Sequence, residues 1–357
     1  MAIKILITKG RQHASTILFL FGFITDAFLL PEIENPVSKY LGLMYLMTLA
    51  LIILAREWIV ARNTASKFEQ RAYAFLTFGV ALFSGSALSF IFIYALRSAA
   101  FAVSWPLFIL LLFVMVANEY ISSHNYRFTL DIGVLFVALT FYFIYDVPIL
   151  FGSVNDVIFF ISIFLSTVAS FLFVWILKHF SETAENELGK GYALSIGIPL
   201  FVAMLYFLNF IPAVPLSLKT SGIYHYIEKL PDGGYIGRVE PDNRLFAKYR
   251  RDTYHMTESD NGIYFFSSVS APAEVSAPIT HLWEYYDERR KEWITSATIA
   301  FDMTGGRQDG YRAFSHKQNV APGMWRVTVK VDDKRIIGRQ RFYVETGKNV
   351  AVEEVRL

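Results

Sequence analysis

The stretch VIFFISIFLSTVASFLFVWIL, residues Val157–Leu177, contains no charged side chain, and its polar residues carry only small hydroxyl groups or a tryptophan N–H. About 20 such residues in a helix that rises 1.5 Å per residue cross the hydrocarbon core of a bilayer. The stretch therefore predicts a membrane-spanning helix. Similar runs recur through the first two thirds of the 357-residue chain and decide its class of fold.

We expect seven spans in all, which are Thr16–Leu30, Tyr40–Ala61, Ala72–Leu96, Phe101–Tyr120, Phe128–Tyr145, Val157–Leu177 and Tyr192–Leu216. The first is the shortest, and the basic residues before it resemble the start of a signal peptide. However, the stretch Leu29–Glu32 offers no cleavage site of small residues, which favours an uncleaved span. Three prolines, Pro199, Pro212 and Pro215, predict a kinked end to the last span.

The overall composition agrees with a membrane protein, because 54% of the residues are hydrophobic and only 18% are charged. Soluble domains average about 25% charged residues. A net charge of +2 excludes a basic nucleic-acid-binding domain, so we expect no nucleic-acid partner. The absence of cysteine excludes disulfides, thiolate metal sites and cysteine nucleophiles. The sequence contains no motif for another metal or for a cofactor.

The composition changes near Lys219, since only 12 of the 33 Lys and Arg residues precede it and no long apolar run follows it. We therefore expect three parts: a transmembrane helical domain at 1–218, an irregular lead-in at 219–262, and a small all-β, sandwich-like domain at 263–357. The alternative stays open that the lead-in contains short strands of its own.

Alternation identifies the strands of the last part. In Trp325–Val331 the odd positions are apolar and the even ones polar, which predicts a half-buried strand with Trp325 inside and Arg326 on the opposite face. Asp332 and Asp333 then predict a hairpin turn. The strands expected are Ile263–Ser268, Ile279–Tyr286, Ile294–Asp302, Met324–Val331 and Ile336–Val344.

The basic residues of the first domain predict its orientation. Ten of the 12 lie on the same side of the predicted spans as the N-terminus, and only Lys39 and Arg97 lie on the other. Because short cytoplasmic loops are enriched in Lys and Arg, we expect a cytoplasmic N-terminus. Seven spans then place the β domain outside the cytoplasmic (inner) membrane, in the periplasm of a bacterium.

Polar residues in or beside spans are candidate membrane sites because each is costly to bury in lipid. The candidates are Asp26, Arg97, Asn118 and Glu119. All lie near span ends, and for Asp26 we favour an interfacial or helix-capping carboxylate. No ionisable residue falls clearly at mid-span, which argues against ion-coupled transport. Ala81, Gly85 and Ser89 predict a helix-packing stripe.

Short motifs in the β part carry a family resemblance. His281-Leu282-Trp283, Gly310-Tyr311-Arg312, Ser315-His316-Lys317 and Gly323–Val327 are similar to the C-terminal domain of unknown function 2914, which ends bacterial envelope proteins. The version fused to a multi-span membrane domain also resembles the chain at Asn118-Glu119. The resemblance implies an architecture and a location. The family has no established activity or catalytic residues to transfer.

Several aromatic and cationic residues of the β part are candidates for ligand binding, because aromatic faces stack on sugars and arginine forks bind carboxylates or phosphates. They are Trp283, Arg307, Tyr311, Arg312, Lys317, Arg326 and Arg339. The alternative stays open that the tryptophans are core residues and the arginines solvated strand faces.

We find no catalytic set. Ser315 and His316 are neighbours on a strand and should point to opposite faces, and no phosphate-binding loop is present. We therefore expect a non-enzymatic inner-membrane protein whose outer β domain binds an envelope polymer, such as a glycan, or a partner protein. One alternative is a transporter or channel subunit with the β domain as a lid. Another is a membrane enzyme that acts on lipid-linked precursors.

Overall fold

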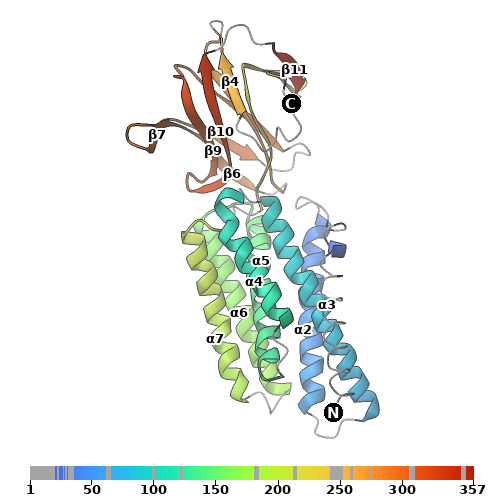
Figure 1. Cartoon of the computed structure of the whole chain (residues 1–357). Coiled ribbons are helices and arrows are strands. Elements are labelled where there is room, and N and C mark those ends of the chain that lie inside the picture. The colour runs from blue at the N-terminus through green and yellow to red at the C-terminus, as the bar shows by residue number, and fades with distance from the viewer. Residues whose placement is uncertain are drawn as a thin grey trace, which may run out of the picture. The chain divides into compact units, whose positions relative to one another are not determined.

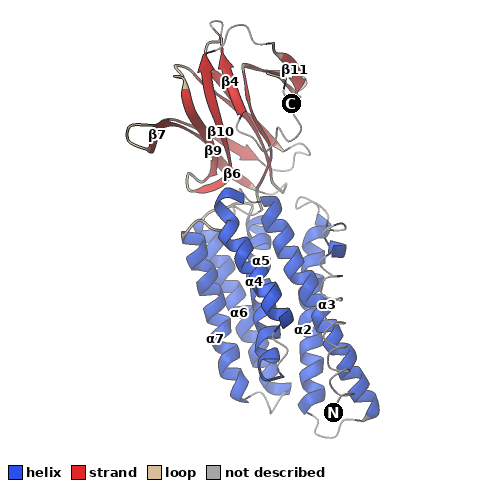
Figure 2. Ribbon diagram, in the orientation of Figure 1, coloured by secondary structure: helices blue, strands red, loops and turns tan. Residues whose placement is uncertain are grey.

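In the computed structural model the chain divides into two units, Met1–Arg97 with Phe101–Pro215, and mainly Leu216–Leu357. Helices belong to the first and strands to the second (Figure 2). The structure describes residues 21, 24–26, 28, 30, 36–61, 66–98, 101–120, 124–180, 185–211, 215–241, 252–257, 260–272, 275–304, 310–346 and 351–357.

The helical unit contains, after a helical segment around Asp26, α2 (Pro36–Ala61), α3 (Lys67–Ser98), α4 (Phe101–Tyr120), α5 (His124–Phe151), α6 (Asp156–Phe180) and α7 (Glu185–Phe207). Among the described residues, α2, α3, α5, α6 and α7 are long and apolar enough to cross a membrane. The described part of α4 contributes a shorter apolar stretch, Trp105–Val114. The central helix is α5, which contacts α2, α4, α6 and α7 (Figure 1).

The two ends of the predicted set of spans differ from expectation. Most of the first span lies outside the described residues. The last span was expected to reach Leu216, but α7 ends at Phe207, and Asn209 takes a left-handed conformation with φ 59°. Such a residue closes a helix by letting the chain turn back on its last carbonyls. The prediction of a kink at Pro215 was therefore wrong, because that residue lies in a turn beyond the helix.

The β unit forms three sheets. Its strands are β1 (Ser217–Tyr224), β2 (Tyr226–Lys229), β3 (Tyr235–Val239), β4 (Asp252–Met256), β5 (Ile263–Ser270), β6 (Ser276–Asp287), β7 (Glu292–Thr304), β8 (Tyr311–Lys317), β9 (Gly323–Val331), β10 (Arg335–Thr346) and β11 (Glu353–Arg356). The sheet orders are β4-β10-β9-β6-β7, β1-β5-β8 and β11-β3-β2. The five predicted strands and the turn between β9 and β10 are confirmed; Asp332 and Asp333 have φ of 52° and 51°.

The lead-in at 219–262 contains most of β1 and all of β2, β3 and β4, so the alternative of short strands holds there. Alternation did not locate these strands, because apolar and polar residues do not alternate along β1 and because β2 and β3 have only 4 and 5 residues. Their order comes from pairing with distant strands: β1 pairs with β5, and β4 pairs in parallel with β10.

The middle layer is the sheet that contains β5, and β5 itself is buried on both faces. On one face the ring of Phe265 lies 6.2 Å from that of Trp283 in the five-stranded sheet. On the other face the ring of Phe266 lies 5.7 Å from that of Tyr235 in the β11-β3-β2 sheet. The expected sandwich therefore has a third, smaller layer.

Gly310 allows β5 and β8 to approach each other. It has φ +77°, and an added Cβ would lie 2.8 Å from the carbonyl oxygen of Val269. Gly233 has a similar φ of +83° but open space around it. We expect Gly310→Ala to destabilise the β unit by about 2 kcal/mol more than Gly233→Ala, because only the first adds a backbone clash to the strain.

Hydrogen exchange of the full-length protein, followed in peptides from β5 and β8, measures this difference. Equal loss of protection in the two variants would show that backbone strain alone, and not the close approach of the strands, requires glycine at position 310.

Candidate functional site

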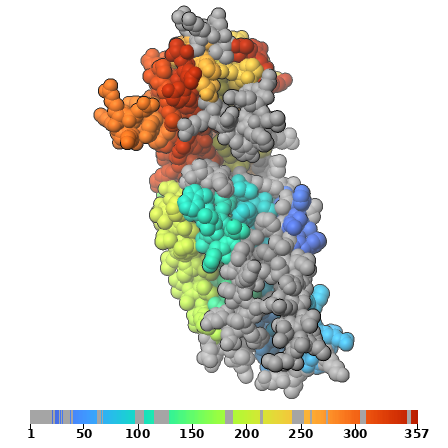
Figure 3. Space-filling model, in the orientation of Figure 1, coloured from blue at the N-terminus to red at the C-terminus, as the bar shows by residue number. Residues whose placement is uncertain are grey.

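A cluster of charged and aromatic side chains lies on the face of the five-stranded sheet opposite Trp283. We call it the arginine face. Its members come from β6, β7, β9 and β10, and they are Glu284, Trp293, Arg326, Thr328, Arg339 and Arg341. The hairpin of β6 and β7 that contributes Glu284 and Trp293 projects from the β unit in Figure 3 (orange).

Strand register brings these residues together. Arg326 on β9 is paired with Glu284 on β6 and with Arg341 on β10, while Arg339 is paired with Thr328. Residues directly opposite each other on neighbouring strands point to the same face. The cluster is therefore a consequence of the way β10, β9 and β6 align.

Arg326 is held from two sides. Its Nε and Nη2 donate to the two carboxylate oxygens of Glu284 at 2.6 and 2.7 Å. Its guanidinium also lies 4.2 Å from the ring centroid of Trp293, as in a cation–π contact. Glu284 is itself buried, so the pair of Arg326 and Glu284 is held in one position, unlike a mobile ion pair on the surface.

The other two arginines, Arg339 and Arg341, lie beside this pair. The Nε of Arg339 donates to the hydroxyl of Thr328 at 3.2 Å. The guanidinium of Arg341, an exposed residue, lies 5.8 Å from the Trp293 centroid. Within the cluster, three guanidinium groups face one carboxylate. Burial and the nearby charges of Arg326 and Arg341 lower the pKa of Arg339. The positive charge of the arginine face is thus only partly compensated, which is a favourable setting for an anion.

The structure brings only two of the seven predicted ligand-binding residues together, Arg326 and Arg339. Trp283 is 0% exposed and donates its indole N–H to Ser315 at 3.0 Å, so its assignment to a ligand surface was wrong. The physical reason is that a large aromatic side chain on an inward-facing strand position fills the core. Arg307 lies outside the described residues.

The remaining three predicted residues lie on β8, in a different sheet. Arg312 donates to the carbonyl oxygens of Leu357 at 3.0 Å and Gly233 at 3.4 Å, so it links β8 to the β11-β3-β2 sheet. Lys317, at one end of β8, donates to the carbonyl of Gln318 at 2.8 Å, and Tyr311 lies at the other end. The seven residues therefore do not form one surface.

Sequence analysis missed Glu284, Trp293 and Arg341. Alternation along Ile336–Val344 would have placed Arg341 on the same face as Arg339. Glu284 lies 42 residues before Arg326 in the sequence and meets it only through the register of β6 and β9. Trp293 lies on β7, whose pairing with β6 shifts in register after Trp283.

A second polar cluster lies in the core between two sheets. Nε2 of His281 is 2.7 Å from the hydroxyl of Ser267, and Nδ1 is 2.9 Å from that of Ser315. Burial lowers the pKa of His281 to about 3, so the imidazole is neutral. His281 is 0% exposed, so the group is a hydrogen-bonded part of the core and not a catalytic pair. His316, as expected, points elsewhere and stacks on Tyr264.

A third cluster surrounds His225, which lies between β1 and β2. Its two ring nitrogens lie 3.1 Å from Asp260 and 3.3 Å from Glu240, and its ring stacks on Tyr254. Glu240 also accepts the backbone N–H of His255 at 2.7 Å and lies 2.7 Å from its Nδ1. Among the described residues, no group of three or more His, Asp and Glu side chains is arranged to hold a metal ion.

Opposite charges dominate the ionisation of this cluster. Burial alone would lower the pKa of His225, but the hydrogen bond to Glu240 and the charge of Asp260 outweigh it and raise this pKa above 6.5. Burial would raise the pKa of Glu240, but its hydrogen bonds to His225 and His255 lower it below 4.5. His225 therefore stabilises the fold fully below its ordinary pKa, and Glu240 does so fully above its own.

We expect the β unit to lose stability as the pH rises through the raised pKa of His225. Thermal unfolding of the full-length protein in detergent at about pH 6 and about pH 8.5 measures the loss, since an unperturbed histidine titrates between these values. The variant His225→Gln should show a smaller difference between the two pH values. An unchanged difference in that variant would assign the pH dependence to other groups.

In the helical unit Asp26 is 4% exposed and accepts hydrogen bonds from the hydroxyls of Tyr45, at 2.6 Å, and Ser89. Asp26 is therefore enclosed by residues of α2 and α3 and does not act as a helix cap, while its position at the membrane interface stays a prediction. The side chains of Arg97, Asn118 and Glu119 lie outside the described part of the chain. Ala81, Gly85 and Ser89 are buried, in agreement with a packing stripe.

Sequence analysis also missed a buried ion pair between α2 and α5. Nη1 of Arg56 lies 2.5 Å from Asp131, and Nη2 lies 3.0 Å from Glu57. The side chains of Arg56 and Asp131 are 4% and 5% exposed. Arg56 is one of the ten basic residues counted on the N-terminal side of the predicted spans, and it lies within α2, about one and a half turns before its end.

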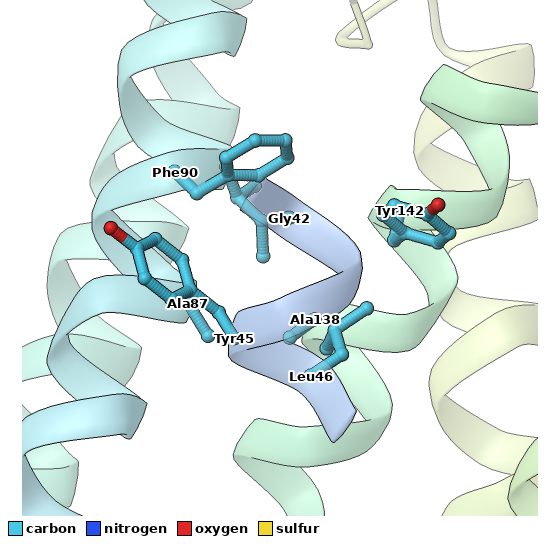
Figure 4. Close-up of a pocket in the computed structure, with 8 residues that line it drawn as sticks. Gly42, Tyr45, Leu46, Ala87, Phe90, Ala138 and Tyr142 are labelled. Carbon is cyan, nitrogen blue, oxygen red and sulfur yellow. The ribbon is translucent and has the colours of Figure 1, made fainter. Parts of the chain in front are cut away.

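A small pocket opens beside Tyr45 among α2, α3 and α5. It is lined by Gly42, Tyr45, Leu46, Ala87, Phe90, Ile91, Ala138 and Tyr142, most of which Figure 4 shows. The pocket has a cavity volume of about 10 Å³, which leaves room for about one water molecule and not for a typical small-molecule ligand.

Comparison with known proteins identifies part of the β unit. Residues 276–344 match the family described as protein of unknown function DUF2914. The DUF2914 segment runs from β6 to Val344 in β10, and every member of the arginine face lies in it. The match confirms the resemblance found in the sequence.

Other comparisons add no functional information. No curated protein matches the chain. A solved structure, Pseudomonas fluorescens alkylpurine DNA glycosylase AlkC bound to DNA containing an abasic site analog, is 13% identical over 88% of this chain and 100% of that one. Its TM-score is 0.23, too low to indicate a shared fold. The DUF2914 segment therefore gives the family resemblance, and the arginine face gives the candidate site.

Proposed function

We propose that the protein is an integral protein of the bacterial cytoplasmic membrane, with a cytoplasmic N-terminus, and that its β unit binds an envelope polymer outside that membrane. Five helices of sufficient length and apolar character support the membrane assignment. The excess of Lys and Arg on the N-terminal side of the spans supports the orientation.

The observation that carries the binding function is the arginine face. The buried carboxylate of Glu284 and the ring of Trp293 fix Arg326 in place. Arg339 and Arg341 add positive charge beside it. Envelope polymers commonly carry carboxylate or phosphate groups, which arginine binds with directed hydrogen bonds. A fixed cationic face on a unit anchored at the membrane suits the capture of such a polymer.

Co-sedimentation of the purified full-length protein in detergent with isolated cell-wall polymer tests this function. We expect the wild-type protein to sediment with the polymer and the double variant Arg339→Gln/Arg341→Gln to remain in solution. Arg289→Gln is the control. It removes one positive charge from the exposed β6–β7 turn and should bind the polymer normally. Sedimentation of the double variant to the same extent as wild type would refute the proposed site.

A second candidate, a transporter or channel subunit, is favoured by buried Asp26, because buried carboxylates in membrane helices often mark ion or solute pathways. Solute flux into liposomes that contain the wild-type protein, lost in Asp26→Asn, would support it. Absence of flux, or equal flux in the variant, would exclude that role for Asp26.

A further inference from the structure

The arginine face differs from an ordinary surface salt bridge in how its arginines are occupied. The fork of Arg326 is already used by Glu284, through hydrogen bonds of 2.6 and 2.7 Å. A new ligand could not separate Arg326 from Glu284 without leaving a charge unpaired, since both side chains are largely enclosed and bonded to each other. Binding capacity must come from the arginines beside them.

Arg339 has such capacity. Its Nε bond to Thr328 fixes the plane of the guanidinium, and among the described residues its Nη groups have no hydrogen-bond partner. Thr328 is in turn 3.4 Å from Glu284, so the orientation of Arg339 depends on the same buried carboxylate. A guanidinium held in one plane with its Nη groups available is arranged to donate two hydrogen bonds to one anionic group.

Arg341 supplies a second cation on the neighbouring row of the sheet. It is paired in register with Arg326, two residues from Arg339 on the same face of β10. Its guanidinium is exposed and lies near Trp293 rather than beside a carboxylate. Within the cluster, the single carboxylate offsets one of three positive charges. The excess is therefore two charges, located at Arg339 and Arg341.

We propose that Arg339 and Arg341 form a binding site for a doubly charged phosphate group, with Arg326, Glu284 and Thr328 as its positioning residues. This proposal rests on the proposed function and names the group of the polymer that is recognised. A phosphate monoester carries close to two negative charges at neutral pH and presents three oxygens, which match two arginines. A carboxylate carries one charge and would leave half of the excess uncompensated.

Two sources present this chemistry, a phosphorylated sugar of an envelope polymer and the headgroup of an anionic lipid. The positions of Arg339 and Arg341 on the sheet favour neither source over the other. The experiment therefore includes one arm for each source, while the binding site itself is tested with inorganic phosphate.

Calorimetric titration of the full-length protein in phosphatidylcholine nanodiscs with inorganic phosphate is the direct test. We expect phosphate to bind at least tenfold more tightly than acetate, and Arg341→Gln to weaken phosphate binding at least tenfold. Arg289→Gln, in the exposed β6–β7 turn, should change it less than twofold. The site would be overturned if Arg341→Gln bound phosphate as tightly as wild type does. The unfolding temperature of Arg341→Gln, which should equal that of wild type, shows that the variant is folded.

The role of Thr328 as a positioning residue has its own test. Thr328→Val removes the hydroxyl that orients Arg339 and should weaken phosphate binding while leaving acetate binding unchanged. Thr328→Ser keeps the hydroxyl and should restore it. Equal weakening by valine and serine would show that the residue acts through packing only.

Glucose 6-phosphate and nanodiscs with phosphatidic acid distinguish the sources. Binding of glucose 6-phosphate at least as tight as that of phosphate supports the polymer, whereas a weaker apparent phosphate affinity in phosphatidic acid nanodiscs supports the headgroup. Polymer sedimentation without phosphate binding overturns this inference and leaves the proposed function standing. Phosphate binding without polymer sedimentation overturns the proposed function instead.

Discussion

Replacing Trp283 by alanine should destabilise the β unit by about 3–5 kcal/mol, because a fully buried indole leaves a large cavity when it is removed. The ring contacts Phe265 and Phe342, and its N–H donates to Ser315. The variant therefore loses apolar contacts with both the middle layer and β10, together with one buried hydrogen bond.

Tyr343→Ala is the matched control for this prediction, since Tyr343 is 38% exposed on the opposite face of the same sheet. It should cost less than about 1 kcal/mol. Hydrogen exchange in peptides of β6 and β10 of the full-length protein measures both. Normal protection in Trp283→Ala, accompanied by lost polymer binding, would restore Trp283 as a ligand residue and contradict its place in the core.

Replacing Asp131 by alanine should destabilise the helical unit by about 3 kcal/mol, because it removes the main partner of a buried arginine. We expect the lower part of the usual range since Glu57 remains 3.0 Å from Arg56 and keeps part of the charge compensated. The variant nevertheless loses the ion pair that joins α2 to α5. The midpoint of thermal unfolding in detergent measures the effect.

Two further variants separate the ion pair from simple packing. Glu187→Gln alters the exposed pair with Lys190 and should cost less than about 1 kcal/mol. The double variant Arg56→Met/Asp131→Leu should be more stable than Asp131→Ala, because no buried charge is left without a partner. A double variant as unstable as Asp131→Ala would contradict the electrostatic explanation.

The sequence predicted what depends on local pattern. Apolar runs located the helices, and alternation located β5, β6, β7, β9 and β10 together with the Asp332–Asp333 turn. It also placed Trp325 inside and Arg326 outside. These features follow from side-chain period and turn preference, which act over a few residues.

Features that depend on distant pairing could not be predicted. The strands of the lead-in are weak alone and form because β1 meets β5 and β4 meets β10. The partners of Arg326 in the arginine face, Glu284 and Trp293, depend on the register of β6, β7 and β9, so they could not be predicted, whereas Arg341 follows from alternation along β10. Likewise, the burial of Asp26 and Arg56 could not be predicted, because their partners Tyr45, Ser89 and Asp131 lie on other helices.

The proposed orientation places the β unit outside the cytoplasmic membrane and the start of α3 on its cytoplasmic side. The chain contains no cysteine, so a single introduced thiol reports one position without background. Glu288→Cys in the β6–β7 turn and Gln70→Cys near the start of α3 are both at exposed positions. A membrane-impermeant maleimide applied to intact spheroplasts should label Glu288→Cys and not Gln70→Cys, and both should react after permeabilisation. Labelling of Gln70→Cys with protection of Glu288→Cys would contradict the account.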